Sequence, residues 1–162
     1  MKKSFTFIIL CLFSVLCYAG PSGNILIGNM STYPMVKDPT LEKIYRMNSW
    51  SLPKKLDVGE QITSYVEFNA NILLNVFTDH AETTYTVECP NKQLEKITIS
   101  AHVVKMDVPN FHYNVLPGYK VTVSSFNCVS AHIANVSNNA GEWSVPFEED
   151  GTVRIYILNY PS

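Results

Sequence analysis

The cysteines are the residues of this chain whose number and positions most directly predict a chemical bond. Cys11 and Cys17 lie in an apolar N-terminal segment, which leaves Cys89 and Cys128 in the rest of the chain. Two cysteines in an exported protein have one intramolecular pairing, so we predict a disulfide between them. The bridge would close a loop of about 40 residues, worth ~4 kcal/mol in the chain-entropy model. The alternatives are two buried free thiols or a bridge to another chain.

Histidine and cysteine spacing gives no sign of a metal or redox centre. The chain has no Cys-x-x-Cys pair, and the histidines outside the N-terminal segment stand at positions 80, 102, 112 and 132. No two of them have the spacing of a metal-binding helix or of a His-x-His strand pair. His102 and His132 fall on the polar side of alternating segments and could meet across neighbouring strands. We predict no metal site and no cofactor.

Catalytic patterns are equally scarce. There is no G-x-S-x-G elbow for a nucleophilic serine. Carboxylate pairs that cleave glycosides are brought together only by the fold and leave no spacing to recognise. Charged residues make up 16% of the chain, and most lie at turns or on the polar side of strand patterns. The sequence favours a protein that is not an enzyme, with a small secreted hydrolase as an alternative.

One stretch, from Asn110 to Tyr119, is unusually aromatic for a loop. An exposed aromatic loop can stack on sugar rings, enter a lipid headgroup layer or anchor a protein partner. On that interpretation the predicted ligand-binding residues are Phe111, His112, Tyr113 and Tyr119. The other interpretation is a short strand in which Phe111, Tyr113 and Val115 pack inward on alternate positions.

The N-terminus predicts export. Met1-Lys-Lys3 is followed by an apolar run from Phe5 to Leu16, and Cys17-Tyr-Ala19 offers a cleavage site before Gly20. The run is shorter than the ~20 residues of a membrane-spanning helix. We expect a signal peptide over residues 1–19, a single domain over 20–162, and a secreted or periplasmic protein. A lipid anchor at Cys17 is the less favoured alternative.

The elements that would position these residues are mostly strands. Alternation of apolar and polar residues marks segments around 62–68, 85–89, 97–103 and 119–123, with turn residues every 8–12 positions. The pattern predicts an all-β domain of about nine to ten short, mostly antiparallel strands, arranged as a β-sandwich or an irregular barrel. A parity change predicts a bulge near Val103, and Pro117-Gly118 predicts a turn.

One short helix is predicted near residues 39–47. Asp38-Pro39 is a helix-start signal, and Leu41, Ile44 and Tyr45 follow at helical spacing. A strand from Lys43 to Trp50 is the competing interpretation.

Charge limits the choice of partners. Removing Lys2 and Lys3 from the 12 basic residues leaves 10 against 14 acidic residues, a net charge of −4. This balance gives no electrostatic argument for nucleic acid as a partner. The sequence therefore favours a secreted, disulfide-stabilised β-sandwich that binds a glycan, lipid or protein surface through its end loops.

A resemblance of layout suggests one further function. The segments Ile25-Leu-Ile-Gly-Asn29, Pro53 to Gly59 and Thr84-Tyr-Thr-Val87 follow an order similar to that of secreted membrane-binding β-sandwiches of the aegerolysin and actinoporin type. The resemblance covers about the first half of the mature chain and carries no specific motif, so no residue role is transferred. It implies a membrane-active, lytic protein as the alternative function.

Overall fold

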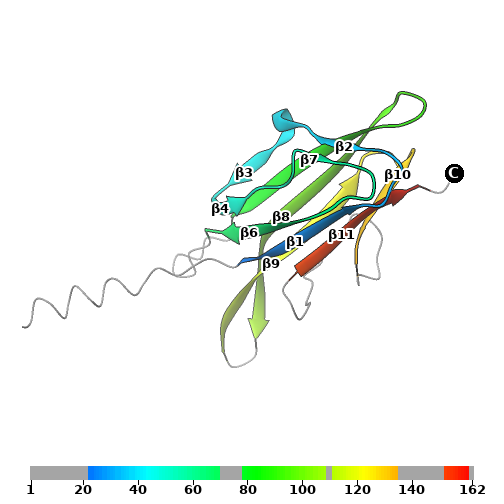
Figure 1. The fold of residues 1–162 in the computed structure, drawn as a ribbon. Helices are drawn as coiled ribbons and strands as arrows, with labels where there is room; N and C mark the ends of the chain where they lie inside the picture. Colours follow the sequence, from blue (N-terminus) through cyan, green and yellow to red (C-terminus); the bar gives the residue numbers. More distant parts are fainter. Residues whose placement is uncertain (1–21, 70–77, 109–110, 135–151, 161–162) are drawn as a thin grey trace, which may run out of the picture.

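The structure is a computed structural model that describes residues 22–69, 78–108, 111–134 and 152–160, with the backbone alone for 104–108 and 111–117. These residues form two stacked β-sheets (Figure 1). The prediction of an all-β sandwich is therefore confirmed. The predicted signal peptide, residues 1–19, lies outside the described residues.

The first sheet, which we call sheet A, has five strands. Their order across the sheet is β10 (Val129–Ile133), β11 (Thr152–Asn159), β1 (Ser22–Asn29), β6 (Gln61–Phe68) and β4 (Met47–Trp50). The strands β1 and β11 pair in parallel, and the other neighbours are antiparallel. The first and last strands described thus lie side by side inside the sheet.

The second sheet, sheet B, has six strands. Their order is β5 (Lys55–Leu56), β2 (Met35–Lys37), β7 (His80–Glu88), β8 (Leu94–Val108) and β9 (Phe111–Val123), and β3 (Lys43–Tyr45) also pairs with β7. The pairing of β7 with β8 ends at His80 and His102. Beyond that point β9 is the only strand paired with β8 in the described part of the chain, and the hairpin projects from the sandwich (Figure 1).

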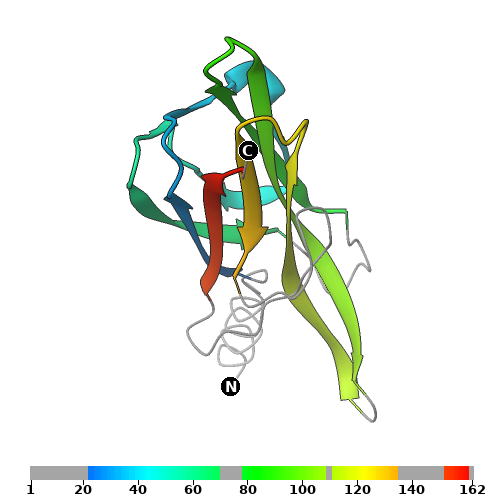
Figure 2. The ribbon, with the colours of Figure 1, turned by 90° about the vertical axis from the view of Figure 1, so that its right-hand side faces the viewer.

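Alternating side chains from both sheets fill the space between them. In β6, Ser64, Val66 and Phe68 are buried while Tyr65 is exposed, as the period of two predicts. The same alternation buries Ile97, Ile99, Ala101 and Val103 of β8 and Val129, Ala131 and Ile133 of β10. Figure 2 shows β1, β6 and β11 on one side of this core and β7, β8 and β9 on the other.

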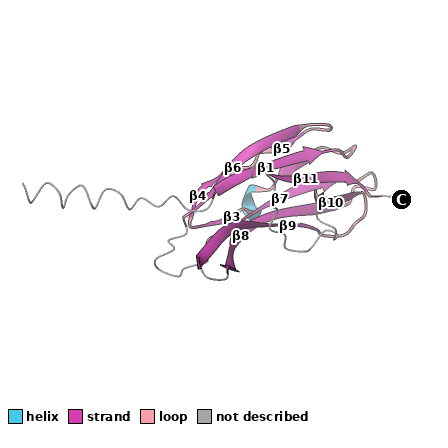
Figure 3. Ribbon diagram, turned by 90° about the horizontal axis from the view of Figure 1, so that it is seen from below, coloured by secondary structure: helices cyan, strands magenta, loops and turns pink. Residues whose placement is uncertain are grey.

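The predicted helix near residues 39–47 is wrong beyond its first turn. The start signal is correct, because Asp38 Oδ1 accepts a hydrogen bond from Thr40 N and a 3-10 helix covers Pro39–Leu41 (Figure 3). The chain then becomes extended, because β3 pairs with β7 and β4 pairs with β6. Pairing with an existing sheet outweighs a helical pattern too short to be stable alone. The competing interpretation, a strand from Lys43 to Trp50, is correct in its extended backbone, but the structure divides that segment at Arg46 into β3 of sheet B and β4 of sheet A.

The predicted turn at Pro117-Gly118 is also wrong. Pro117 lies opposite Val103 and Gly118 lies opposite His102 in an unbroken ladder. Proline has no N–H to offer a neighbouring strand, but β9 is at the edge of sheet B, where none is needed. The register shift in this hairpin lies between Met106 and Val108 rather than near Val103.

Candidate functional site

Three of the predicted ligand-binding residues lie near the tip of the β8–β9 hairpin. Phe111 opens β9 opposite Val108, and His112 and Tyr113 follow it in the strand. The backbone is therefore a strand and not a loop. The predicted ligand-binding role of these three residues stays a prediction.

Tyr119, the fourth predicted residue, belongs to the core. Its side chain is 1% exposed, and its hydroxyl has no hydrogen-bond partner within the described part of the structure. Burial raises the pKa of the Tyr119 phenol far above its usual value. The residue lies opposite Ala101 in β8, whose side chain is also buried. Tyr119 therefore packs between the sheets and presents no surface to a ligand.

The histidines are dispersed over both sheets. His102 lies opposite His80 in sheet B, while His132 is in β10 of sheet A, so His102 and His132 are not on neighbouring strands. The ring of His80 stacks on Tyr45, with ring centroids 5.5 Å apart. Burial lowers the pKa of His102 below its usual 6.5, against the opposing effect of a hydrogen bond to the backbone of Gly118.

A buried ion pair lies at the end of the sandwich near His80. Asp79 is fully buried, and its Oδ1 is 3.4 Å from Nε of Arg46. Burial raises the pKa of the Asp79 carboxyl, and the charge of Arg46 acts in the opposite direction. Arg46 has a φ of 56° at the corner between β3 and β4. The pair fixes this corner, and the buried carboxylate is out of reach of a substrate.

The opposite end of the sandwich carries the disulfide. Cys89 follows β7 in sheet B, Cys128 precedes β10 in sheet A, and the two are bonded with their Cα atoms 5.8 Å apart. The predicted bridge is therefore confirmed, and both residues are buried. We call this part of the molecule the disulfide end. Here β1, β5, β7, β9 and β11 finish and β8 and β10 begin.

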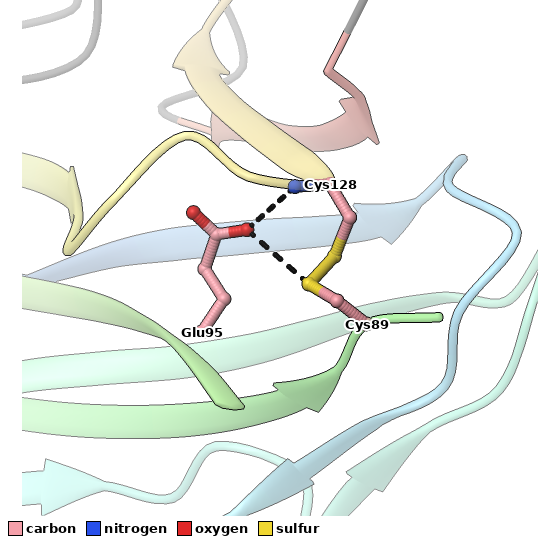
Figure 4. Close-up of side chains that lie close together, drawn as sticks. All are labelled: Cys89, Glu95 and Cys128. Carbon is pink, nitrogen blue, oxygen red and sulfur yellow. Dashed lines mark hydrogen bonds between the residues drawn. A yellow bond between two sulfur atoms is a disulfide. The ribbon is translucent and has the colours of Figure 1, made fainter. Parts of the chain in front are cut away.

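A fully buried carboxylate, Glu95, holds the chain beside the disulfide (Figure 4). Its Oε2 accepts hydrogen bonds from the backbone N–H groups of Cys128 (3.0 Å) and Val129 (3.1 Å), and its Oε1 accepts one from Asn127 (3.1 Å). Such charge-assisted bonds are stronger than bonds between neutral groups. Glu95 therefore fixes the backbone that leads from the β9–β10 connection into β10.

Cys89, Glu95 and Cys128 also have the chemistry of metal ligands. One ligand atom from each lies within 4.8 Å of the other two. The sulfur atoms are bonded to each other, so neither is a thiolate, and the 3.7 Å approach of Cys89 Sγ to Glu95 Oε2 involves no sulfur-bound hydrogen. Both carboxylate oxygens already accept backbone hydrogen bonds. The group is a structural brace in its disulfide form.

Asn29 holds two further loops at the disulfide end. The buried side chain donates from Nδ2 to the carbonyl oxygens of Tyr33 (2.8 Å) and Leu56 (3.2 Å) and accepts at Oδ1 from Ser31 Oγ (2.7 Å). Its carbonyl accepts from the N–H of Gly59, whose φ of 78° suits glycine in the turn before β6. The loops after β1 and β5 are thus bonded to each other through the side chain and the carbonyl of one residue, Asn29.

Apolar side chains are exposed on these braced loops. Nine large hydrophobic residues are exposed in the described part of the chain, and five lie at the disulfide end: Met30, Val58, Leu94, Phe126 and Tyr160. Phe126 and Tyr160 are in contact, with ring centroids 5.5 Å apart and planes tilted by 42°. The N–H of Tyr160 donates to the carbonyl of Cys128, which joins the ends of β11 and β10. The pair is the main candidate for a binding site.

The backbone at Phe126 is unfavourable for an L-residue. Its φ is 26°, in the left-handed region that favours glycine. Strained residues persist where the surroundings determine their conformation, and they are concentrated at functional sites. The surroundings here are the Glu95 bonds that begin at the next residue, Asn127.

Neither Glu95 nor Phe126 was singled out from the sequence. Glu95 has the same parity as Ile97 and Ile99, so the alternation itself places a carboxylate on the core side of β8. That signal could have identified it as a buried acceptor. For Phe126 the signal is weaker, namely a large apolar residue within the polar stretch Ser124-Ser-Phe-Asn127.

No helix among the described residues has the length and apolar character to cross a bilayer. The chain matches no protein-family model, and a search of curated protein sequences finds no match to it.

Proposed function

We propose that the protein is an exported binding protein that contacts a glycan, lipid or protein surface through the loops of its disulfide end. The observation that supports this most is the exposed pair Phe126 and Tyr160 on a braced and strained backbone. Aromatic side chains dominate the energetics of many interfaces because they bury a large area with few rotatable bonds.

The cost of the strained backbone at Phe126, compared with the packing of its ring, favours a role in binding over a role in packing. Holding a non-glycine residue in a sparsely populated backbone region costs on the order of 1–3 kcal/mol. Packing of Phe126 offsets this strain only in part, because 44% of the residue is exposed. Phenylalanine at this position therefore adds little net stability. Bracing by Glu95 and the disulfide would, however, reduce the entropy lost when a ligand orders the loop.

The test uses two substitutions with opposite effects on strain. Phe126→Gly removes the ring and relieves the backbone, so the variant should melt no lower than the wild type and lose binding. Tyr160→Ala removes the second ring. Tyr65→Ala is the matched control, because Tyr65 is 50% exposed on the outer face of β6. Binding of the purified proteins is screened on a glycan array, on phospholipid vesicles and by cross-linking to cell-surface proteins.

The binding of these variants distinguishes the disulfide end from other possible binding sites. The proposal requires a ligand whose binding weakens in Phe126→Gly and Tyr160→Ala and not in Tyr65→Ala. If all three variants bind every detected ligand as the wild type does, the disulfide end is not the binding site. The hairpin residues are tested in the same screen with Phe111→Ala and Tyr113→Ala. Release of a dye from vesicles, as distinct from adsorption to them, would favour the lytic alternative.

A further inference from the structure

The residues that flank the aromatic pair along the chain are uncharged and rich in hydrogen-bonding side chains, and the Glu95 carboxylate that accepts from Asn127 N is fully buried. Ser125 and Asn127 flank Phe126, and Asn159 precedes Tyr160. All three polar residues are exposed, as is Thr32, which is bonded to Asn159. Neither 124–128 nor 159–160 contains a charged residue. A ligand that touches both rings therefore meets amide and hydroxyl groups around them.

Among the described residues, the side-chain amides of Asn127 and Asn159 each use only one of their two polar atoms in hydrogen bonds. Asn127 donates from Nδ2 to Ser125 Oγ at 2.8 Å, and its Oδ1 has no partner among the residues described. Asn159 accepts at Oδ1 from Thr32 N (2.9 Å) and Thr32 Oγ1 (3.1 Å), and its Nδ2 has no partner in the same part of the structure. The aromatic pair thus lies between one available acceptor and one available donor.

This combination selects for a particular chemistry. A pyranose ring has an apolar face of C–H groups that stacks on aromatic rings, and hydroxyl groups at its rim that both donate and accept hydrogen bonds. An anionic ligand would instead need a cationic partner such as arginine or lysine. We infer that Phe126, Tyr160, Asn127 and Asn159 form a subsite for a neutral sugar residue. The inference rests on the proposed function and specifies its ligand class.

The inference favours an exposed end of a glycan over a small molecule enclosed by protein. Phe126 and Tyr160 are each more than two-fifths exposed, so a ligand on them would be covered on one face only. The remaining exposed apolar residues of the disulfide end lie elsewhere: Met30 and Val58 on other loops and Leu94 at the start of β8. One sugar residue can be held by the pair while the rest of the glycan extends away.

The experiment measures binding of the purified protein to an array of neutral and anionic oligosaccharides and to phosphatidylcholine vesicles. Binding to at least one neutral glycan is expected, and raising the salt concentration should not weaken it, because no charge is paired. Phe126→Gly and Tyr160→Ala should each weaken binding by about tenfold or more. Asn127→Ala should weaken it by roughly fivefold, since it removes one hydrogen bond. Asn48→Ala, an exposed amide bonded to Glu67 in sheet A, is the matched control.

Each result has a defined meaning. If neutral glycans do not bind, or bind equally to the wild type and to Asn127→Ala and Phe126→Gly, the sugar subsite is refuted. If the ring variants instead lose binding to vesicles or to a protein, the disulfide end remains the binding surface and only the ligand class is wrong. If they lose binding to nothing, both proposals fail. Melting temperatures of all variants exclude unfolding as the cause.

Discussion

Replacement of Glu95 by glutamine tests whether one buried carboxylate holds the disulfide end together. The amide keeps one acceptor oxygen and replaces the other with an NH2 group. Glu95 accepts from three backbone N–H groups, so at least one of them must then face a donor. The variant keeps nearly the same volume, and the change isolates charge and hydrogen bonding from packing.

The expected magnitude follows from the three bonds. Hydrogen bonds to a charged group contribute about 1.5–3 kcal/mol each, against about 0.5–1.5 for neutral pairs. Two weakened bonds and one lost bond would remove roughly 3–5 kcal/mol, and relief of the buried charge offsets part of that. We expect the free energy of unfolding to fall by about 2–3 kcal/mol, which lowers Tm by roughly 5–10 °C in a domain of this size.

The measurement is urea unfolding followed by intrinsic fluorescence, with hydrogen exchange as a local readout. The amides of Cys128 and Val129 should exchange faster in the variant, because their acceptor is weakened. Glu88→Gln is the matched control, since it makes the same charge change at an exposed position at the end of β7, opposite Leu94 of β8. If the unfolding free energies of Glu95→Gln and Glu88→Gln differ by less than about 0.5 kcal/mol, and the amides of Cys128 and Val129 exchange as in the wild type, Glu95 does not hold this loop.

Three further outcomes are expected. The double variant Cys89→Ser, Cys128→Ser should lose up to about 4 kcal/mol of stability in chemical unfolding, and reduced wild type should match it; equal stability of oxidised and reduced protein would contradict this. Gly28→Ala should lower the free energy of unfolding by about 1–2 kcal/mol, because the added Cβ would stand 2.9 Å from Cδ1 of Tyr156. The loss should be smaller when Tyr156 is replaced by serine. An equal loss with and without Tyr156 would exclude the clash. His102 has a lowered pKa, so its stabilising contribution is present above pH 6.5 and is lost as pH falls below that value. The Tm of His102→Gln should therefore fall less on acidification than the Tm of the wild type. The same pH dependence of Tm in both proteins would contradict a role for His102.

Much of the fold could be predicted because burial on one face leaves a period of two in the sequence. Ser64, Val66 and Phe68 in β6 are an example, and the alternation in β8 is another. The disulfide followed from the number of cysteines rather than from geometry. The strands at 43–50 were harder to predict, because the sheet partners that hold them lie far along the chain in β6 and β7.

The candidate site was less accessible to sequence reasoning. The run Phe111 to Tyr119 looks like one aromatic loop, yet the ladder with β8 makes it a strand and turns Tyr119 into the core. Pro117-Gly118 has the composition of a turn, and only its position at a sheet edge makes it a strand. Phe126 and Tyr160 are 34 residues apart (160 − 126), and meet because β10 and β11 are paired. Proximity of that kind leaves no local pattern.

The parallel pairing of β1 with β11 has a consequence for the order in which the protein folds. Every strand of sheet B lies within the continuous stretch from Met35 to Val123, so this sheet needs nothing from the last described strand. Sheet A cannot be completed in that way, because β11 separates β10 from β1. Non-local pairings of this kind slow folding, since a long loop must close before its contacts form. The chain can therefore assemble one layer of its sandwich as it emerges, but it must keep an inner position of the other layer open for β11, which is synthesised after the other described strands.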